Sequence, residues 1–73
     1  MIVIMEGWEK GMEKVSLTKL QTQQLGLSLK DAKTNVDSLL DGKTVTIEVA
    51  DNFVAKEFIN AAQRIGVKCR QKE

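Results

Sequence analysis

The sequence predicts an α/β domain of the α+β kind, in two layers, with three helices on one face of a three-stranded sheet. Two observations support this prediction. Apolar residues recur at helical spacing in three segments, and they alternate with polar residues in "KTVTIEV", as in a half-buried strand. The segments follow the order β-α-α-β-α-β, and each has one apolar side, which two packed layers would bury. All 73 residues, 1–73, are expected to form this single domain.

The first strand is expected at residues 2–5, where Ile-Val-Ile-Met is β-branched and apolar on both faces. Such a strand suits the centre of the sheet. Because the helices cover only one side of three strands, the other face of this strand needs a cover. Two coverings remain open: the ring of Trp8, from the loop that follows, or a second copy of the chain in a homodimer.

A first helix is predicted over residues 17–25, with the hydroxyl of Ser16 as its N-terminal cap. Val15 and Leu20 are spaced for a hydrophobic staple across that cap. Gly26 is expected to close the helix, because glycine adopts the left-handed conformation at no steric cost. Three polar side chains are expected on the wet face of this helix: Gln21, Gln23 and Gln24.

A second helix is predicted over residues 29–40. Ser28 and Asp31 form an S-x-x-D pattern, a variant of the capping box that opens helices. The apolar residues that follow share one helical stripe: Leu29, Ala32, Val36, Leu39 and Leu40. Leu29 starts this stripe and is expected mainly in the core, although its place in the first turn also allows partial exposure. Gly26 and Ser28 together make a tight corner between the two helices.

The rest of the chain is expected to form a strand, a helix and a strand, over residues 43–49, 53–65 and 67–71. In the strand, Val45, Ile47 and Val49 face one way and the intervening polar residues face the other. Either Asp51 or Asn52 caps the following helix.

Composition narrows the classes of function. The chain is 42% hydrophobic and 29% charged, which indicates a globular domain, and its net charge of +1 gives no overall attraction to nucleic acid or an anionic membrane. No apolar run approaches the roughly 18 residues of a membrane-spanning helix. Cys69 is alone, which excludes an internal disulfide, favours a cytoplasmic location and predicts a buried thiol on the last strand. Histidine, metal-ligand clusters and phosphate-binding glycine loops are absent, so no enzymatic activity, cofactor or metal is expected.

One segment has a distinctive pattern, which reads KVSLTKLQTQQLGLSLKDAKTNVD over residues 14–37. It resembles the C-terminal domain of the bacterial large-subunit ribosomal stalk protein, the L-seven/L-twelve family. That family opens its first helix with a lysine-valine pair and continues through a glycine-rich corner to a valine-acid pair. Ser28 stands where the family has the middle glycine of the corner. The later stretch AKEFINAAQRIGVKC is similar to the third helix of the family, so the resemblance covers residues 14–69.

The resemblance implies the same β-α-α-β-α-β fold and a contact face for translational GTPases on the first two helices. The matching positions are Lys14, Val15, Lys19, Leu29, Lys30 and Lys33. The expected function is therefore a non-catalytic protein-interaction module, which binds a translation factor or another acidic, amphipathic surface at the corner of the two helices. The corner is expected to bring Lys14 and Lys19 near the second helix. The dimerising domain and hinge of the family have no counterpart here, so attachment to the ribosome by that route is not expected.

Two other classes of function stay open. A nucleic-acid binder would use the lysine-rich corner or the last strand, where Lys68, Arg70 and Lys72 alternate. These charges have no interleaved aromatic residues, which argues against nucleic acid as a partner and favours a charge-protected edge strand. A ClpS-like protease adaptor shares the broad fold, but it needs an acidic pocket for an amino-terminal residue, which the sequence does not place.

Overall fold

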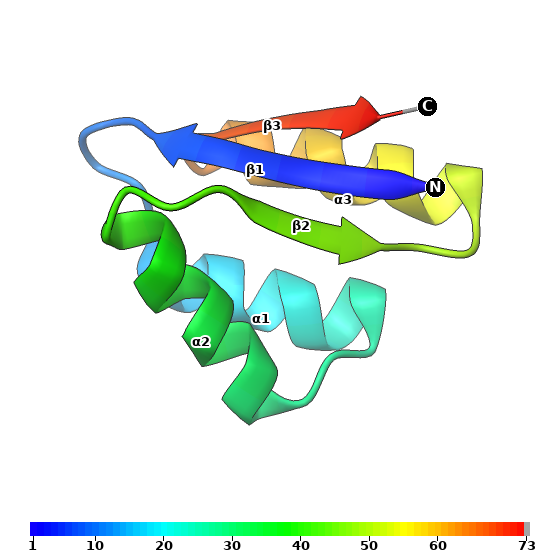
Figure 1. Cartoon of the computed structure of the whole chain (residues 1–73), viewed down its shortest axis with the longest axis horizontal. Coiled ribbons are helices and arrows are strands. Elements are labelled where there is room, and N and C mark those ends of the chain that lie inside the picture. Colours follow the sequence, from blue (N-terminus) through cyan, green and yellow to red (C-terminus); the bar gives the residue numbers. More distant parts are fainter. Residues whose placement is uncertain (73) are drawn as a thin grey trace.

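The structure of the protein, a computed structural model, describes residues 1–72. Its elements are β1 (Ile2–Trp8), α1 (Lys14–Leu25), α2 (Leu29–Leu40), β2 (Val45–Glu48), α3 (Asn52–Arg64) and β3 (Val67–Lys72). The predicted α+β fold and the predicted element order are both confirmed. Figure 1 shows the three strands side by side, with the helices on one side of them.

The three strands form an antiparallel sheet in the order β2-β1-β3, so the apolar first strand is the central one. β1 is longer than the predicted 2–5, because its pairing with β3 resumes after a bulge between Met5 and Gly7. The bounds of the edge strands also change: the observed strand is shorter than the predicted 43–49, and one residue longer than the predicted 67–71.

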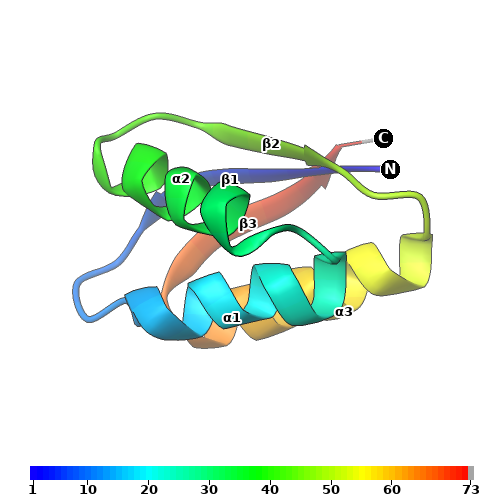
Figure 2. The same ribbon diagram turned by 90° about the horizontal axis from the view of Figure 1, so that it is seen from below.

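The three helices lie on the same side of the sheet but not at equal depth. The backbones of α2 and α3 approach strands, whereas the backbone of α1 approaches only α2 and α3. Figure 2 shows α1 alongside these two helices, on the side of the molecule farthest from the strands. The six elements therefore enclose one core. It consists of Val3, Met5, Leu17, Val36, Leu39, Val45, Ile47, Val49, Ala55, Phe58, Ala62, Val67 and Cys69.

The start of α1 differs from the prediction. The helix begins at Lys14 rather than at residue 17, and its N-cap residue, Glu13, makes no capping bond with its side chain. Ser16 lies inside the first turn, where its hydroxyl donates to the Glu13 carboxylate at 3.5 Å, so the predicted serine cap is wrong. The predicted staple is wrong as well, because Val15 is 69% exposed on the solvent side of the helix. Gly26 closes α1 at φ +69°, as expected.

The bounds of α2 agree with the predicted 29–40. The hydroxyl of Ser28 accepts a hydrogen bond from the N–H of Asp31 at 3.1 Å, which confirms the predicted cap. Ala32, Val36 and Leu39 are buried as expected. Leu29 is not in the core: it is 57% exposed, and the two residues after it, Lys30 and Asp31, are exposed as well.

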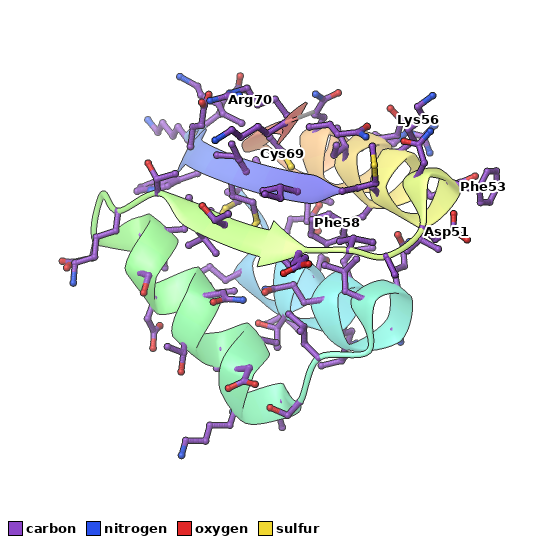
Figure 3. The ribbon with its side chains drawn as sticks, turned by 45° about the vertical axis from the view of Figure 1, so that its right-hand side comes forward. Asp51, Phe53, Lys56, Phe58, Cys69 and Arg70 are labelled. Atoms are coloured by element: carbon purple, nitrogen blue, oxygen red, sulfur yellow. The ribbon has the colours of Figure 1, made fainter. Side chains whose placement is uncertain are left out.

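The helix α3 is shifted by one residue from the predicted 53–65. Its cap is Asp51, whose carboxylate accepts from the N–H of Phe53 at 2.7 Å. Figure 3 shows the two phenylalanines of this helix in different environments: Phe58 points into the core and is fully buried, whereas Phe53 projects from the first turn into solvent. The buried residues of this helix, Ala55, Phe58 and Ala62, hold it against β3 and β1.

The outer face of the sheet, away from the helices, is covered by its own charged side chains. Ile4 points to this face and is only 7% exposed. Its cross-strand partner is Arg70, which is labelled in Figure 3. The guanidinium of Arg70 pairs with the Glu6 carboxylate, so the aliphatic stem of the arginine shields the isoleucine. Trp8 does not cover this face. It pairs with Val67, whose side chain is buried towards the helices, and directly opposed residues share a face. The homodimer stays a prediction.

One glutamine joins the first two helices. Gln21, expected on the wet face of α1, is fully buried. Its Nε2 donates to the carbonyl of Ala32 at 3.1 Å, and its Oε1 accepts from the Asn35 amide at 2.8 Å. The expected wet face is thus wrong for Gln21, which follows the buried Leu17 by one helical turn, whereas Gln23 is exposed.

We expect Gln21→Ala to lower the free energy of unfolding by about 2–4 kcal/mol, because it removes buried volume and both bonds to α2. Urea denaturation followed by circular dichroism measures the change. The matched control is Gln23→Ala on the same helix, which should stay within about 0.5 kcal/mol of the parent. Equal losses for the two variants would contradict the linking role of Gln21.

Candidate functional site

The predicted site residues all lie on the surface. They define what we call the basic face, which consists of Lys14, Val15, Lys19, Leu29, Lys30 and Lys33. Two of them, Val15 and Leu29, are large aliphatic residues that are more than half exposed. Single exposed aliphatic residues are common on protein surfaces, so the arrangement around them decides whether they matter.

Both helices of the basic face carry an exposed aliphatic residue followed four positions later by a lysine. Val15 precedes Lys19 by four residues on α1, and Leu29 precedes Lys33 by four residues on α2. Residues at this spacing are neighbours on a helix surface. Each helix therefore presents an aliphatic side chain with a lysine one turn further along, which combines apolar area with positive charge.

The corner between the helices does not gather the whole basic face. Because α1 begins at Lys14, this residue lies at the end of α1 that is remote from the corner. At about 1.5 Å per residue, about 16 Å of helix separates it from Leu25, the last residue before the turn. The corner itself holds only Leu29, Lys30 and Lys33. The basic face is therefore not confined to the corner but extends along α1.

The lysines of the basic face have no acidic partner within residues 1–72. The ion pairs in this part of the chain join Lys43 to Asp41 and Arg70 to Glu6. Lys14 and Lys30 also occupy the first turns of α1 and α2, where the helix dipole is positive and disfavours a cation. Their positions therefore do not stabilise the helices, and they raise the local positive potential.

A groove of about 320 Å³ continues from the basic face between α1 and α3. Its lining residues are Ser16, Lys19, Leu20, Gln23, Ala61, Arg64 and Ile65. The lining carries two positive charges, those of Lys19 and Arg64, and no negative one. The sequence interpretation missed Arg64, because periodicity does not say that α1 packs beside α3. The only signal was a basic residue in the last turn of a helix, which is also expected from the helix dipole.

Two findings concern other kinds of site. Among residues 1–72, no group of three or more histidine, cysteine, aspartate or glutamate side chains is placed to hold a metal ion. The helices in that range are also too short and too polar for any of them to cross a membrane.

Cys69 is buried in the core, as predicted for the last strand. Burial raises the pKa of its thiol from 9.0 to about 12, and the negative charge of Glu6 adds to this effect. The thiol is therefore protonated at neutral pH, and only the thiolate is a strong nucleophile. Cys69 acts as a small hydrophobic residue on the buried face of β3.

The raised pKa predicts a loss of stability in alkali. Below pH 9 the thiol is neutral in both the folded and the unfolded chain, so its contribution to stability is complete. Between pH 9 and about 12 the unfolded chain loses the proton first, and the free energy of unfolding falls. We expect urea denaturation at several pH values to show a shallower alkaline slope for Cys69→Ala than for the parent. Identical slopes would contradict the burial effect.

Comparison of the chain with protein-family models, with curated proteins and with solved structures gives no match. The resemblance to the ribosomal stalk domain is therefore a prediction that these comparisons leave untested.

Proposed function

We propose that this protein is a non-catalytic protein-interaction module, which binds an acidic, amphipathic surface of a protein partner through its basic face. The observation that carries the proposal is the repeated pair of an exposed aliphatic residue and an unpaired lysine on α1 and on α2. Aliphatic anchors supply the apolar contact of an interface, and the surrounding cations select an acidic partner and accelerate its approach.

The shape of the basic face favours an elongated partner segment. Val15 lies in the first turn of α1, and Leu29 opens α2 just after the turn that ends α1. The helix α1 runs about 15 Å from Val15 to its last residue, Leu25. A partner helix of about ten residues, or a shorter extended segment, would span this length. Acidic side chains on its flanks would meet Lys19 and Arg64 in the groove between α1 and α3.

The resemblance to the stalk domain suggests a translation factor as the partner. We infer this class from the lysine-valine pair at Lys14 and Val15 and from the corner sequence around Lys30 and Lys33. A cytoplasmic location belongs to the same proposal.

We expect the double variant Lys30→Glu, Lys33→Glu to lose its partners in affinity purification from the native host. The fold should persist, because a glutamate in the first turn of α2 suits the helix dipole better than a lysine. Thermal denaturation should therefore give a midpoint equal to or above that of the parent. The matched control is Lys56→Glu on the exposed side of α3 (Figure 3). An unchanged set of partners in the double variant would reject the basic face.

A second pair of variants separates protein binding from nucleic-acid binding. Val15→Ser with Leu29→Ser removes the aliphatic anchors and leaves every lysine in place. We expect it to weaken capture of the protein partner at least about tenfold, with a change in stability within about 0.5 kcal/mol. If the basic face binds nucleic acid instead, retention on RNA or DNA columns will be unaffected by this variant and will fall steeply with salt.

A further inference from the structure

On β2, two residues point their backbone N–H and C=O groups away from β1, towards the free edge of the sheet. The N–H of Val49 donates to the carbonyl of Met1 at 2.7 Å, and the register pairs Ile2 with Glu48. In an antiparallel pair, residues alternate between bonding to the neighbouring strand and pointing away from it. Ile47 therefore bonds to β1, whereas the N–H and C=O groups of Thr46 and Glu48 face the free edge.

The opposite edge of the sheet, formed by β3, is protected against pairing with another strand. On β3 the same alternation points the carbonyl of Cys69 outwards, where it accepts a hydrogen bond from the Gln63 side chain of α3 at 3.0 Å. Lys68, Arg70 and Lys72 add exposed charges along β3, a common device against unwanted strand pairing. β2 reads Val-Thr-Ile-Glu and contains neither a lysine nor a proline.

A hollow of about 300 Å³ lies between the edge of β2 and the helix α2. Its lining residues are Leu27, Asp31, Thr34, Asn35, Thr46, Ile47 and Glu48. This lining carries two carboxylates, on Asp31 and Glu48, and no positive charge. The hollow thus offers unpaired backbone groups, an apolar side chain at Leu27 and a negative potential in one place.

We infer that the free edge of β2 is a docking site for an extended, basic peptide segment of a partner, which would join the sheet as a fourth strand. Backbone bonds to Thr46 and Glu48 supply the pairing, as in other cases of strand addition. Lysine or arginine side chains on one face of the segment would reach Asp31 on the α2 side of the sheet, and those on its other face would reach Glu48, whose side chain points away from the helices. A second copy of the chain fits less well, because the hollow beside its own β2 edge carries the same negative charge. This inference is independent of the proposed function, since it uses a different surface and the opposite charge.

The test uses a fluorescein-labelled peptide of eight residues in which pairs of lysines alternate with pairs of valines, so that both faces of an added strand carry lysine. The matched peptide has glutamate in place of every lysine. We expect the basic peptide to bind the whole protein, as measured by fluorescence anisotropy, and to shift the amide resonances of Thr46 and Glu48 in NMR spectra. The acidic peptide should bind at least about tenfold more weakly, because it meets Asp31 and Glu48 as like charges.

Thr46→Pro tests the backbone contact directly. Proline removes the outward N–H without removing a bond to β1, so the variant should keep the circular dichroism spectrum of the parent. It should bind the basic peptide at least about tenfold more weakly, which corresponds to the loss of one backbone hydrogen bond. Unfolding of Thr46→Pro, or unchanged binding, would overturn the inference.

Glu48→Lys tests the charge in a chain whose backbone is unaltered. It should reverse the preference between the two peptides, because the lysine side chain faces the segment in place of a carboxylate. Unchanged binding of the basic peptide to Glu48→Lys would contradict the proposal. A parent protein that sediments as a dimer, and becomes monomeric in Thr46→Pro, would replace the peptide by a second copy of the chain and so overturn it too.

Discussion

The hydrogen bonds of Gln21 hold the helix α1 to its neighbour α2, and much of the surface depends on this link. The backbone of α1 approaches no strand, so its place is set by α2 and α3 alone. Leu17 and Leu20 supply apolar contact to the core, but apolar contact is non-directional and permits a helix to rotate or slide. The buried amide of Gln21 has directional partners on Ala32 and Asn35. A rotation of α1 would leave these polar groups buried and unpaired, which is costly.

This constraint orients the surfaces that we propose to bind partners. With Leu17 and Gln21 turned inwards, Val15 and Lys19 face solvent, and the groove towards Arg64 opens between α1 and α3. Although the net charge is only +1, the positive and negative charges are distributed unevenly over the surface. The basic face and its groove are positive, whereas the hollow beside β2 carries two carboxylates. Two surfaces of opposite sign on one small domain suit the joining of two different partner segments.

The small size of the core explains why helices cover only one face of the sheet. A domain of this size buries only about 60% of the surface of its unfolded chain, so a second layer of helices on the outer face is out of reach. Arg70 and Glu6 shield Ile4 there without adding residues to the core. The cost of ordering such long side chains is moderate, and their charged ends remain in water.

Periodicity in the sequence by itself determined the element order, the cap at Ser28, the left-handed Gly26 and the inward faces of β2 and β3, because these follow from local geometry and from the repeat of apolar residues. The resemblance to the stalk domain, rather than periodicity, supplied the six residues of the basic face as a set. Only the tertiary structure decided that Gln21 is buried, that Leu29 is exposed, that Arg64 lies beside Lys19 and that β2 has an open edge. Each of these depends on which element packs beside which, and residues far apart in the chain make that choice together.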